Sequence, residues 1–134
     1  MRNLLLTVFF MSFCYILNAQ QQIDPRIREL YGDKANEMLG NNPELLNFWN
    51  DLLTNRIEIA ELSASEDAVK FIKLSQIDLL NKYNPSIKRD VVFNPETFNP
   101  LKYNLEFTAK DTKKVYVVDN SNYIIIISPQ TINH

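Results

Sequence analysis

The sequence predicts an α+β fold in which two N-terminal helices, with a third left open, pack on a C-terminal three-stranded antiparallel meander. Apolar residues recur every three or four positions across residues 25–53, as they do in amphipathic helices. Between residues 103 and 127 they instead alternate, or form short β-branched blocks separated by polar turns. Residues 20–134 suffice for one modest core, so we expect a single domain there.

Residues 1–19 are expected to be a secretory signal peptide. Arg2 gives a positive start, residues 4–17 are almost entirely apolar, and Asn18-Ala19-Gln20 is small and polar, which is the layout of a cleavable export signal. A membrane anchor is the alternative, but this run is shorter than the roughly 20 residues that span a bilayer. Lipidation of Cys14 is a second alternative, although the bulky Phe13 directly precedes it inside the apolar run, where lipoprotein signals have a small residue. We expect a periplasmic or outer-membrane-associated protein without an integral membrane span after cleavage.

Both helices are predicted to begin at a capping residue followed by proline, at Asp24-Pro25 and at Asn42-Pro43. The first should end near Gly40. Gly32 interrupts it at a cost of about 1 kcal/mol relative to alanine, so we expect a kink, a break or a close approach there. The second carries a wide apolar face that includes the only tryptophan, which suits packing against two neighbours, expected to be the first helix and a sheet.

Residues 56–83 give conflicting signals. Ile57-Glu58-Ile59 alternates as a strand does, whereas residues 63–66 have the form of a capping box that opens a helix. Residues 70–74 are again rich in β-branched and aromatic side chains. We expect a short strand at 57–62 and mixed structure at 66–83, with a third helix or extra strands both open.

The C-terminal third predicts the meander. Three Asn-Pro steps make residues 84–100 an irregular connection, and strands are expected at residues 103–107, 115–118 and 123–127. Because the last strand is apolar on both faces, we expect both to be covered, either in a central position under a helix or by a partner.

The composition excludes several classes of function. The chain has one histidine, the terminal His134, and one cysteine, Cys14, so serine or cysteine triads and the common zinc sites lack their ligands. Two glycines are too few for a phosphate-binding loop. The net charge is −2 without a basic cluster, which disfavours nucleic acid. We predict no catalytic, cofactor-binding or metal-binding residue, no cofactor and no nucleotide.

Three groups of residues are candidate sites. Glu29, Asp33 and Glu37 share four-residue spacing, which indicates a site for a cation or a basic partner or, more simply, a solvated helix face. Carboxylate pairs at Glu58 and Glu61, or at Glu66 and Asp67, have the chemistry of a glycan hydrolase. Residues 94–103 form a proline-stiffened loop with aromatics expected to be exposed, which indicates a binding surface for a sugar or a protein.

Several stretches resemble a family of small uncharacterised envelope proteins of Bacteroidetes-type bacteria, loosely associated with genes for type IX secretion and gliding motility. They are Asn42-Pro43-Glu44-Leu45-Leu46, Asn99-Pro100-Leu101-Lys102-Tyr103-Asn104 and Tyr123-Ile124-Ile125-Ile126-Ile127. The Asn18-Ala19-Gln20 end of the expected signal peptide resembles, more generally, exported proteins of the same bacterial group. The resemblance implies an envelope resident and assigns no activity or functional residue.

The sequence therefore predicts a non-catalytic accessory or interaction protein of the envelope with a protein partner, in which one edge of the sheet accepts a partner strand. The alternatives are a small glycan- or lipid-binding protein and, third, the carboxylate hydrolase.

Overall fold

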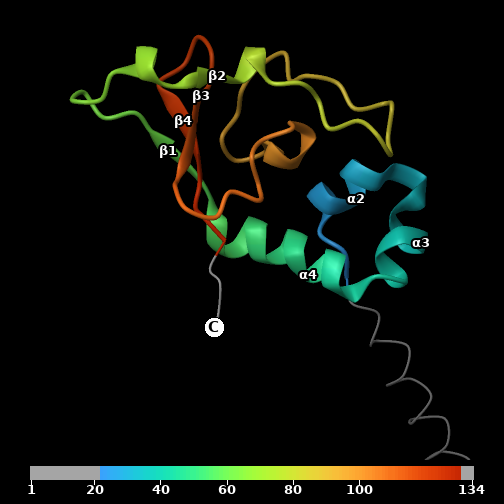
Figure 1. Ribbon diagram of the computed structural model, residues 1–134. Coiled ribbons are helices and arrows are strands. Elements are labelled where there is room, and N and C mark those ends of the chain that lie inside the picture. Colours follow the sequence, from blue (N-terminus) through green and yellow to red (C-terminus); the bar gives the residue numbers. More distant parts are fainter. Residues whose placement is uncertain (1–21, 131–134) are drawn as a thin grey trace, which may run out of the picture.

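The computed structural model describes residues 22–130, so the expected signal peptide, Cys14 and His134 lie outside the described residues. The fold is α+β, as predicted: short helices come first and a sheet follows (Figure 1). The helices are α2 (Pro25–Tyr31), α3 (Ala35–Gly40) and α4 (Pro43–Asp51). The strands are β1 (Ile57–Glu61), β2 (Ile72–Lys73), β3 (Lys114–Val117) and β4 (Tyr123–Ile127).

The first predicted helix breaks at Gly32. Asp24 caps α2 by accepting the Arg26 N–H at 2.8 Å, and Gly32 ends α2 with φ of +56°. A Cβ at Gly32 would lie 3.1 Å from Cγ of Asn84, whose amide donates to the Glu29 carbonyl at 2.7 Å. The break thus follows from two needs that only glycine meets, a positive φ and a close approach.

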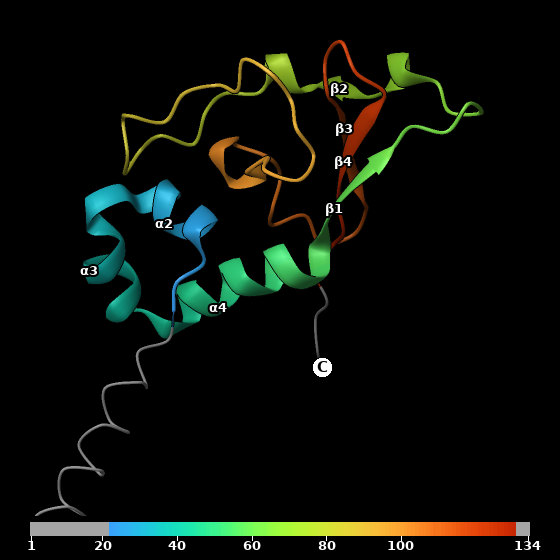
Figure 2. The same ribbon diagram turned by 180° about the vertical axis from the view of Figure 1, so that it is seen from behind.

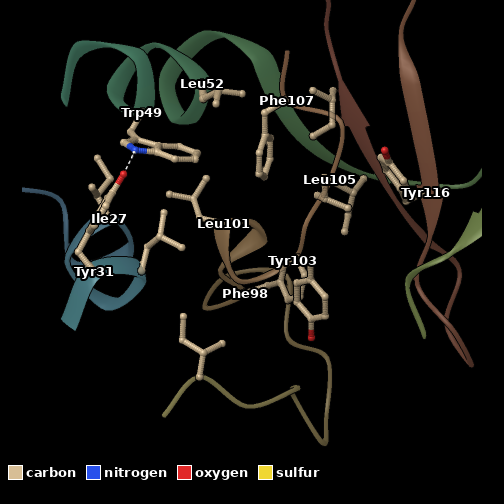
Figure 3. Packing of buried hydrophobic residues seen from close by; sticks show 14 of the residues in the cluster. Ile27, Tyr31, Trp49, Leu52, Phe98, Leu101, Tyr103, Leu105, Phe107 and Tyr116 are labelled. Carbon is tan, nitrogen blue, oxygen red and sulfur yellow. Dashed lines mark hydrogen bonds between the residues drawn. The ribbon is translucent and has the colours of Figure 1, made fainter. Parts of the chain in front are cut away.

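Helix α4 begins at Pro43 as predicted, and the Asn42 side chain caps it by accepting the Leu45 N–H. It continues as a π-helical turn, Leu52–Arg56, that leads directly into β1. Trp49 of α4 is buried, and its indole N–H donates to the Tyr31 hydroxyl at 2.8 Å. Its ring meets Phe107 edge-on (Figure 3). The expected contact of α4 with the first helix is therefore confirmed, and the second neighbour of Trp49 is the 103–107 segment, which is not a strand.

The sheet is four-stranded and mixed, in the order β1-β4-β3-β2, so the predicted three-stranded antiparallel meander is wrong. Strand β4 pairs antiparallel with both β1 and β3, while β2 pairs parallel with β3. The short strand predicted at 57–62 is confirmed as β1, and β4 is central. Consequently β1 and β2, which run parallel to each other, are the two edges.

Residues 103–107 do not form the predicted strand. Their alternation does describe burial, because Tyr103, Leu105 and Phe107 are all buried. The backbone, however, closes tight turns instead of joining the ladder: the N–H groups of Leu105 and Phe107 each donate to the carbonyl two residues earlier, at 2.8 Å. Alternating burial alone therefore does not establish strand pairing.

A third helix does not form between residues 56 and 83. Only half of the predicted capping box forms: the Ser63 N–H and hydroxyl both donate to the Glu66 carboxylate, but the Glu66 N–H donates to the Ser63 carbonyl and closes a turn. Two 3-10 turns, Ala68–Lys70 and Leu74–Gln76, flank the two-residue β2. The extended backbone at Phe71, φ −101° and ψ 149°, ends the first turn before helix propagates.

Candidate functional site: the free edge of β1 and a cavity beside the turn after β2

The hydrogen-bond alternation of β1 determines which backbone groups remain free. The Leu62 N–H donates to the Asn122 carbonyl at 2.6 Å, and the Ser128 N–H donates to the Arg56 carbonyl at 2.8 Å. Both bonds share the register of the β1–β4 ladder. In an antiparallel pair, hydrogen-bonded residues alternate with residues whose N–H and C=O point away. Even-numbered residues of β1 therefore bond β4, and the odd-numbered ones face outward.

The outward-facing backbone groups of β1 belong to Ile57, Ile59 and Glu61. The Ile57 N–H is already used, because it donates to the Leu52 carbonyl and ends the π-helical turn. Within residues 22–130, no hydrogen bond reaches the N–H of Ile59 or Glu61. Both ribbon views show no strand of the described chain beside this edge (Figures 1 and 2). The edge has the backbone pattern that pairs with an added strand.

Arg56 fixes the start of this edge. It is 5% exposed, and its guanidinium donates to the Phe107 carbonyl at 2.6 Å and to the Ser128 carbonyl at 3.2 Å. Its Nη1 has no hydrogen-bond partner among residues 22–130. These bonds join the end of the π-helical turn, the end of β4 and the 103–107 segment, and thereby hold β1 in its register.

The candidate carboxylate pairs do not assemble a hydrolytic site. Glu58 and Glu61 are exposed and three residues apart on one strand, so their side chains leave opposite faces of the sheet. Glu66 accepts from Ser63, and Asp67 accepts the Val69 N–H at 3.1 Å. Each of these two carboxylates is thus engaged in local turn capping. The acidic strand instead gives the β1 edge a negative charge.

The predicted acidic face on the first helix is divided by the break at Gly32. Glu29 lies on α2 and accepts the Asn99 amide at 2.8 Å, while Glu37 lies on α3. Within the described part of the chain, no group of three or more histidine, cysteine, aspartate or glutamate residues is arranged to hold a metal ion. Through this hydrogen bond, Glu29 holds α2 to the Asn99-Pro100 step.

The aromatic loop is buried rather than exposed, so that expectation is wrong. Phe98 and Tyr103 are 5% and 2% exposed. The Phe98 ring stacks on Tyr103 with 5.5 Å between centroids, and the Arg89 guanidinium lies 5.6 Å from the Tyr103 centroid. The ring faces that a sugar would need for stacking are consequently occupied by other side chains.

Beside these rings lies a cavity of about 190 Å³ with two carboxylates in its wall, Asp90 and Asp119. Asp90 accepts from Lys102 at 2.8 Å and from the Tyr103 hydroxyl at 2.9 Å. Asp119 accepts from both the N–H and the hydroxyl of Ser75. Burial, above all, raises the pKa of Tyr103. Both carboxylates thus have partners within the protein.

The asparagine-proline pattern of the sequence did not reveal Arg56 or the Asp90–Lys102–Tyr103 network. Both depend on partners more than ten residues away in the chain, and no local spacing encodes them. The Val91-Val92 pair, by contrast, has a local signal in the sequence, because it is an isolated aliphatic pair inside a polar connection.

Comparisons with protein-family models, with curated proteins and with solved structures found no match to this chain.

Proposed function

We propose that this chain is an exported accessory protein of the cell envelope that acts by binding another protein and carries no catalytic activity. The observation that carries the proposal is the free edge of β1, where Ile59 and Glu61 present unpaired N–H groups on an exposed, acidic strand. An extended segment of a partner gains main-chain hydrogen bonds by pairing with such an edge.

The partner belongs, in this proposal, to a secretion or motility assembly of the envelope. Support for that placement comes from the sequence resemblance at residues 42–46, 99–104 and 123–127 and from the export signal expected at residues 1–19. Charge adds a constraint on the partner segment, because Glu58 and Glu61 favour basic residues opposite them.

The test is crosslinking in living cells that express the tagged full chain, followed by identification of co-purified envelope proteins. One stoichiometric partner is expected. Glu61→Pro removes an outward N–H and should abolish the crosslink, whereas the matched Glu61→Ala keeps that N–H and should retain it. Export of both variants is followed by fractionation. Recovery of the wild-type protein solely as an uncrosslinked monomer would refute the proposal.

A second candidate function, a binder of a small polar ligand, is favoured by the cavity at Asp90 and Asp119. It ranks second because both carboxylates and the neighbouring ring faces already have partners. Thermal-shift screening of soluble sugars and amines against wild type and Asp119→Asn is its test. A stabilising ligand that the variant fails to recognise would promote this function to first place.

A further inference from the structure

The free backbone groups of β1 form a set that an identical strand can match. The free donors are the N–H groups of Ile59 and Glu61, because the Ile57 N–H on one side and the Ser63 N–H on the other are already used. The outward carbonyls of Ile57, Ile59 and Glu61 accept no hydrogen bond from residues 22–130. Each edge therefore supplies donors and acceptors at fixed, alternating positions, which is what a second copy needs.

An antiparallel register of two copies that is centred on Ile59 uses every free donor. Ile59 then lies opposite Ile59 of the second copy, and the two residues exchange both main-chain hydrogen bonds. Glu61 lies opposite Ile57 of the second copy and donates to its carbonyl, and two-fold symmetry repeats that bond. The Ile57 N–H, which is already used, is not required as a donor.

The side chains favour this register over its alternatives. Ile57 and Ile59 are partly buried and pack against the core, so each has an exposed remainder at the edge. Centring on Ile59 places two of these isoleucines together and covers part of that remainder. A register centred on Ala60 also uses both donors, but it sets Ile59 opposite Glu61. A parallel in-register pair sets each glutamate beside its own copy, which is unfavourable for like charges.

The surroundings of the edge leave room for a second strand. Both ribbon views show no strand of the described chain beside it (Figures 1 and 2). Helix α4 leads from the start of β1 towards α2 and α3, away from the sheet. Within residues 22–130, neither α4 nor any other helix is long and apolar enough to cross a bilayer.

We propose that two copies of this chain pair antiparallel through β1, centred on Ile59, and that this pairing covers the edge until a partner strand displaces the second copy. The inference rests on the proposed function, because it concerns the regulation of that same edge. Only the five residues of β1 pair, so the dimer is weak and exchanges with monomer. The edge thus stays within reach of a partner while it is protected from other extended chains.

Glu58 sets the direction of this exchange. In the register centred on Ile59, it lies opposite Ala60 of the second copy and diagonal to Glu58 of that copy, at about 7–8 Å. Two exposed carboxylates at this distance repel each other enough to weaken the pairing about twofold in water. A basic residue of a partner segment is attracted by the same carboxylate, so the partner strand displaces the second copy.

The experiment is sedimentation velocity of the protein, purified after expression of the full chain, between about 10 µM and 1 mM. We expect a monomer–dimer equilibrium with dimer populated at the upper concentrations. Glu61→Pro removes an outward N–H from each copy and should raise the dissociation constant at least about tenfold, whereas the matched Glu61→Ala should dimerise nearly as wild type does. Every variant is prepared with the same N-terminus, checked by intact mass, and circular dichroism checks that it is folded.

Glu58→Gln gives opposite signs for the two occupants of the edge. It removes the diagonal repulsion, so it should tighten self-association about twofold, and added salt should act in the same direction on the wild type. In cells, the same variant should weaken the crosslink to an envelope partner, because it loses the attraction to basic residues. Glu37→Gln, at an exposed site on α3, is the control and should change neither measurement.

Disulfide trapping checks the register. In a Cys14→Ser background, Ile59→Cys places two cysteines opposite each other with their Cα atoms about 5.5 Å apart, which a disulfide can bridge. This variant should form a covalent dimer under mild oxidation. Ala60→Cys places its two cysteines on a diagonal and should crosslink more slowly.

Three outcomes would overturn the proposal. They are a monomeric wild type at every concentration, equal dimerisation of Glu61→Pro and Glu61→Ala, and faster crosslinking of Ala60→Cys than of Ile59→Cys. None of them bears on the proposed function, which fails when no envelope partner is crosslinked in cells. A dimer with the expected variant behaviour, found together with no envelope partner, would support self-pairing and assign the edge to the second copy alone.

Discussion

The two edges of the same sheet offer opposite chemistry. Strand β1 is paired with β4 over five residues and leaves backbone N–H and C=O groups facing outward on an acidic strand. Strand β2 pairs over only two residues and is flanked by exposed aliphatic side chains and lysines. We propose that the first edge pairs with an extended partner strand, whereas the second exposes apolar side chains and charges of both signs. The comparison shows that what an edge strand exposes depends on its neighbours as much as on its hydrogen bonds.

The largest expected effect lies at the base of the β1 edge. Arg56→Ala leaves the carbonyls of Phe107 and Ser128 without their donor and removes the packed aliphatic stem. The free energy of unfolding should therefore fall by about 3 kcal/mol. Urea denaturation measures it. Arg56→Met keeps the stem and should lose about half as much. Equal stability of Arg56→Met and wild type would mean that the guanidinium bonds add nothing.

The alternation of free and paired groups along β1 gives a matched pair of proline variants. The Ala60 N–H faces β4, so Ala60→Pro removes a ladder bond and should cost about 2–3 kcal/mol. The Glu61 N–H faces outward, so Glu61→Pro should cost less than about 1 kcal/mol. Thermal unfolding of the two proteins compares them directly. Similar destabilisation by both would show that the assigned register is off by one residue.

At the β2 edge, the hydrogen bonds between Ser75 and Asp119 make a smaller contribution to the free energy of unfolding, and this contribution depends on pH. Slight burial raises the pKa of Asp119, but hydrogen bonds from Ser75 outweigh it and hold that pKa below its usual 3.8. A lowered folded-state pKa stabilises the protein above the unfolded value, and this contribution is lost as pH falls through the folded value. Because Ser75 is exposed and solvent screens this link, Ser75→Ala should lower the free energy of unfolding by less than about 1 kcal/mol at neutral pH.

The Ser75–Asp119 link is best checked by NMR titration of the Asp119 carboxyl. The pKa should move up towards the ordinary value in Ser75→Ala, and the stability difference between variant and wild type should shrink in acid. Ser65→Ala, in the exposed turn after β1, is the control and should leave this titration unchanged. An unchanged Asp119 pKa in Ser75→Ala would contradict the link.

Which parts of this fold were predictable follows from where their causes lie. The helix starts at Pro25 and Pro43 and the break at Gly32 depend on local capping and on glycine, so sequence spacing predicts them. Residues 103–107 were predicted wrongly because alternation reports burial and not pairing. The position of β1 beside β4 was not predicted either, because strand order depends on contacts more than sixty residues apart along the chain.

The same limit applies to the candidate sites. Exposed carboxylates at Glu58 and Glu61 were visible in the sequence, but their facing opposite sides follows from the strand they share. The aromatic loop was predicted to be exposed because proline and asparagine usually mark surfaces. Its rings are instead covered by one another and by Arg89, whose bonds to the turn after β2 have no local sequence signature.

The smallest predicted change in the free energy of unfolding concerns the exposed Val91 and Val92 near the β2 edge. Replacing Val91 and Val92 together by serine should change the free energy of unfolding by less than about 0.5 kcal/mol, because side chains this exposed bury almost nothing on folding. Ile125→Ala, in the fully buried centre of β4, is the contrasting control and should cost about 3 kcal/mol. A marked loss of stability in the double serine variant would mean that the valines pack within the fold. Unchanged stability would mean that these two exposed side chains contribute nothing measurable to folding.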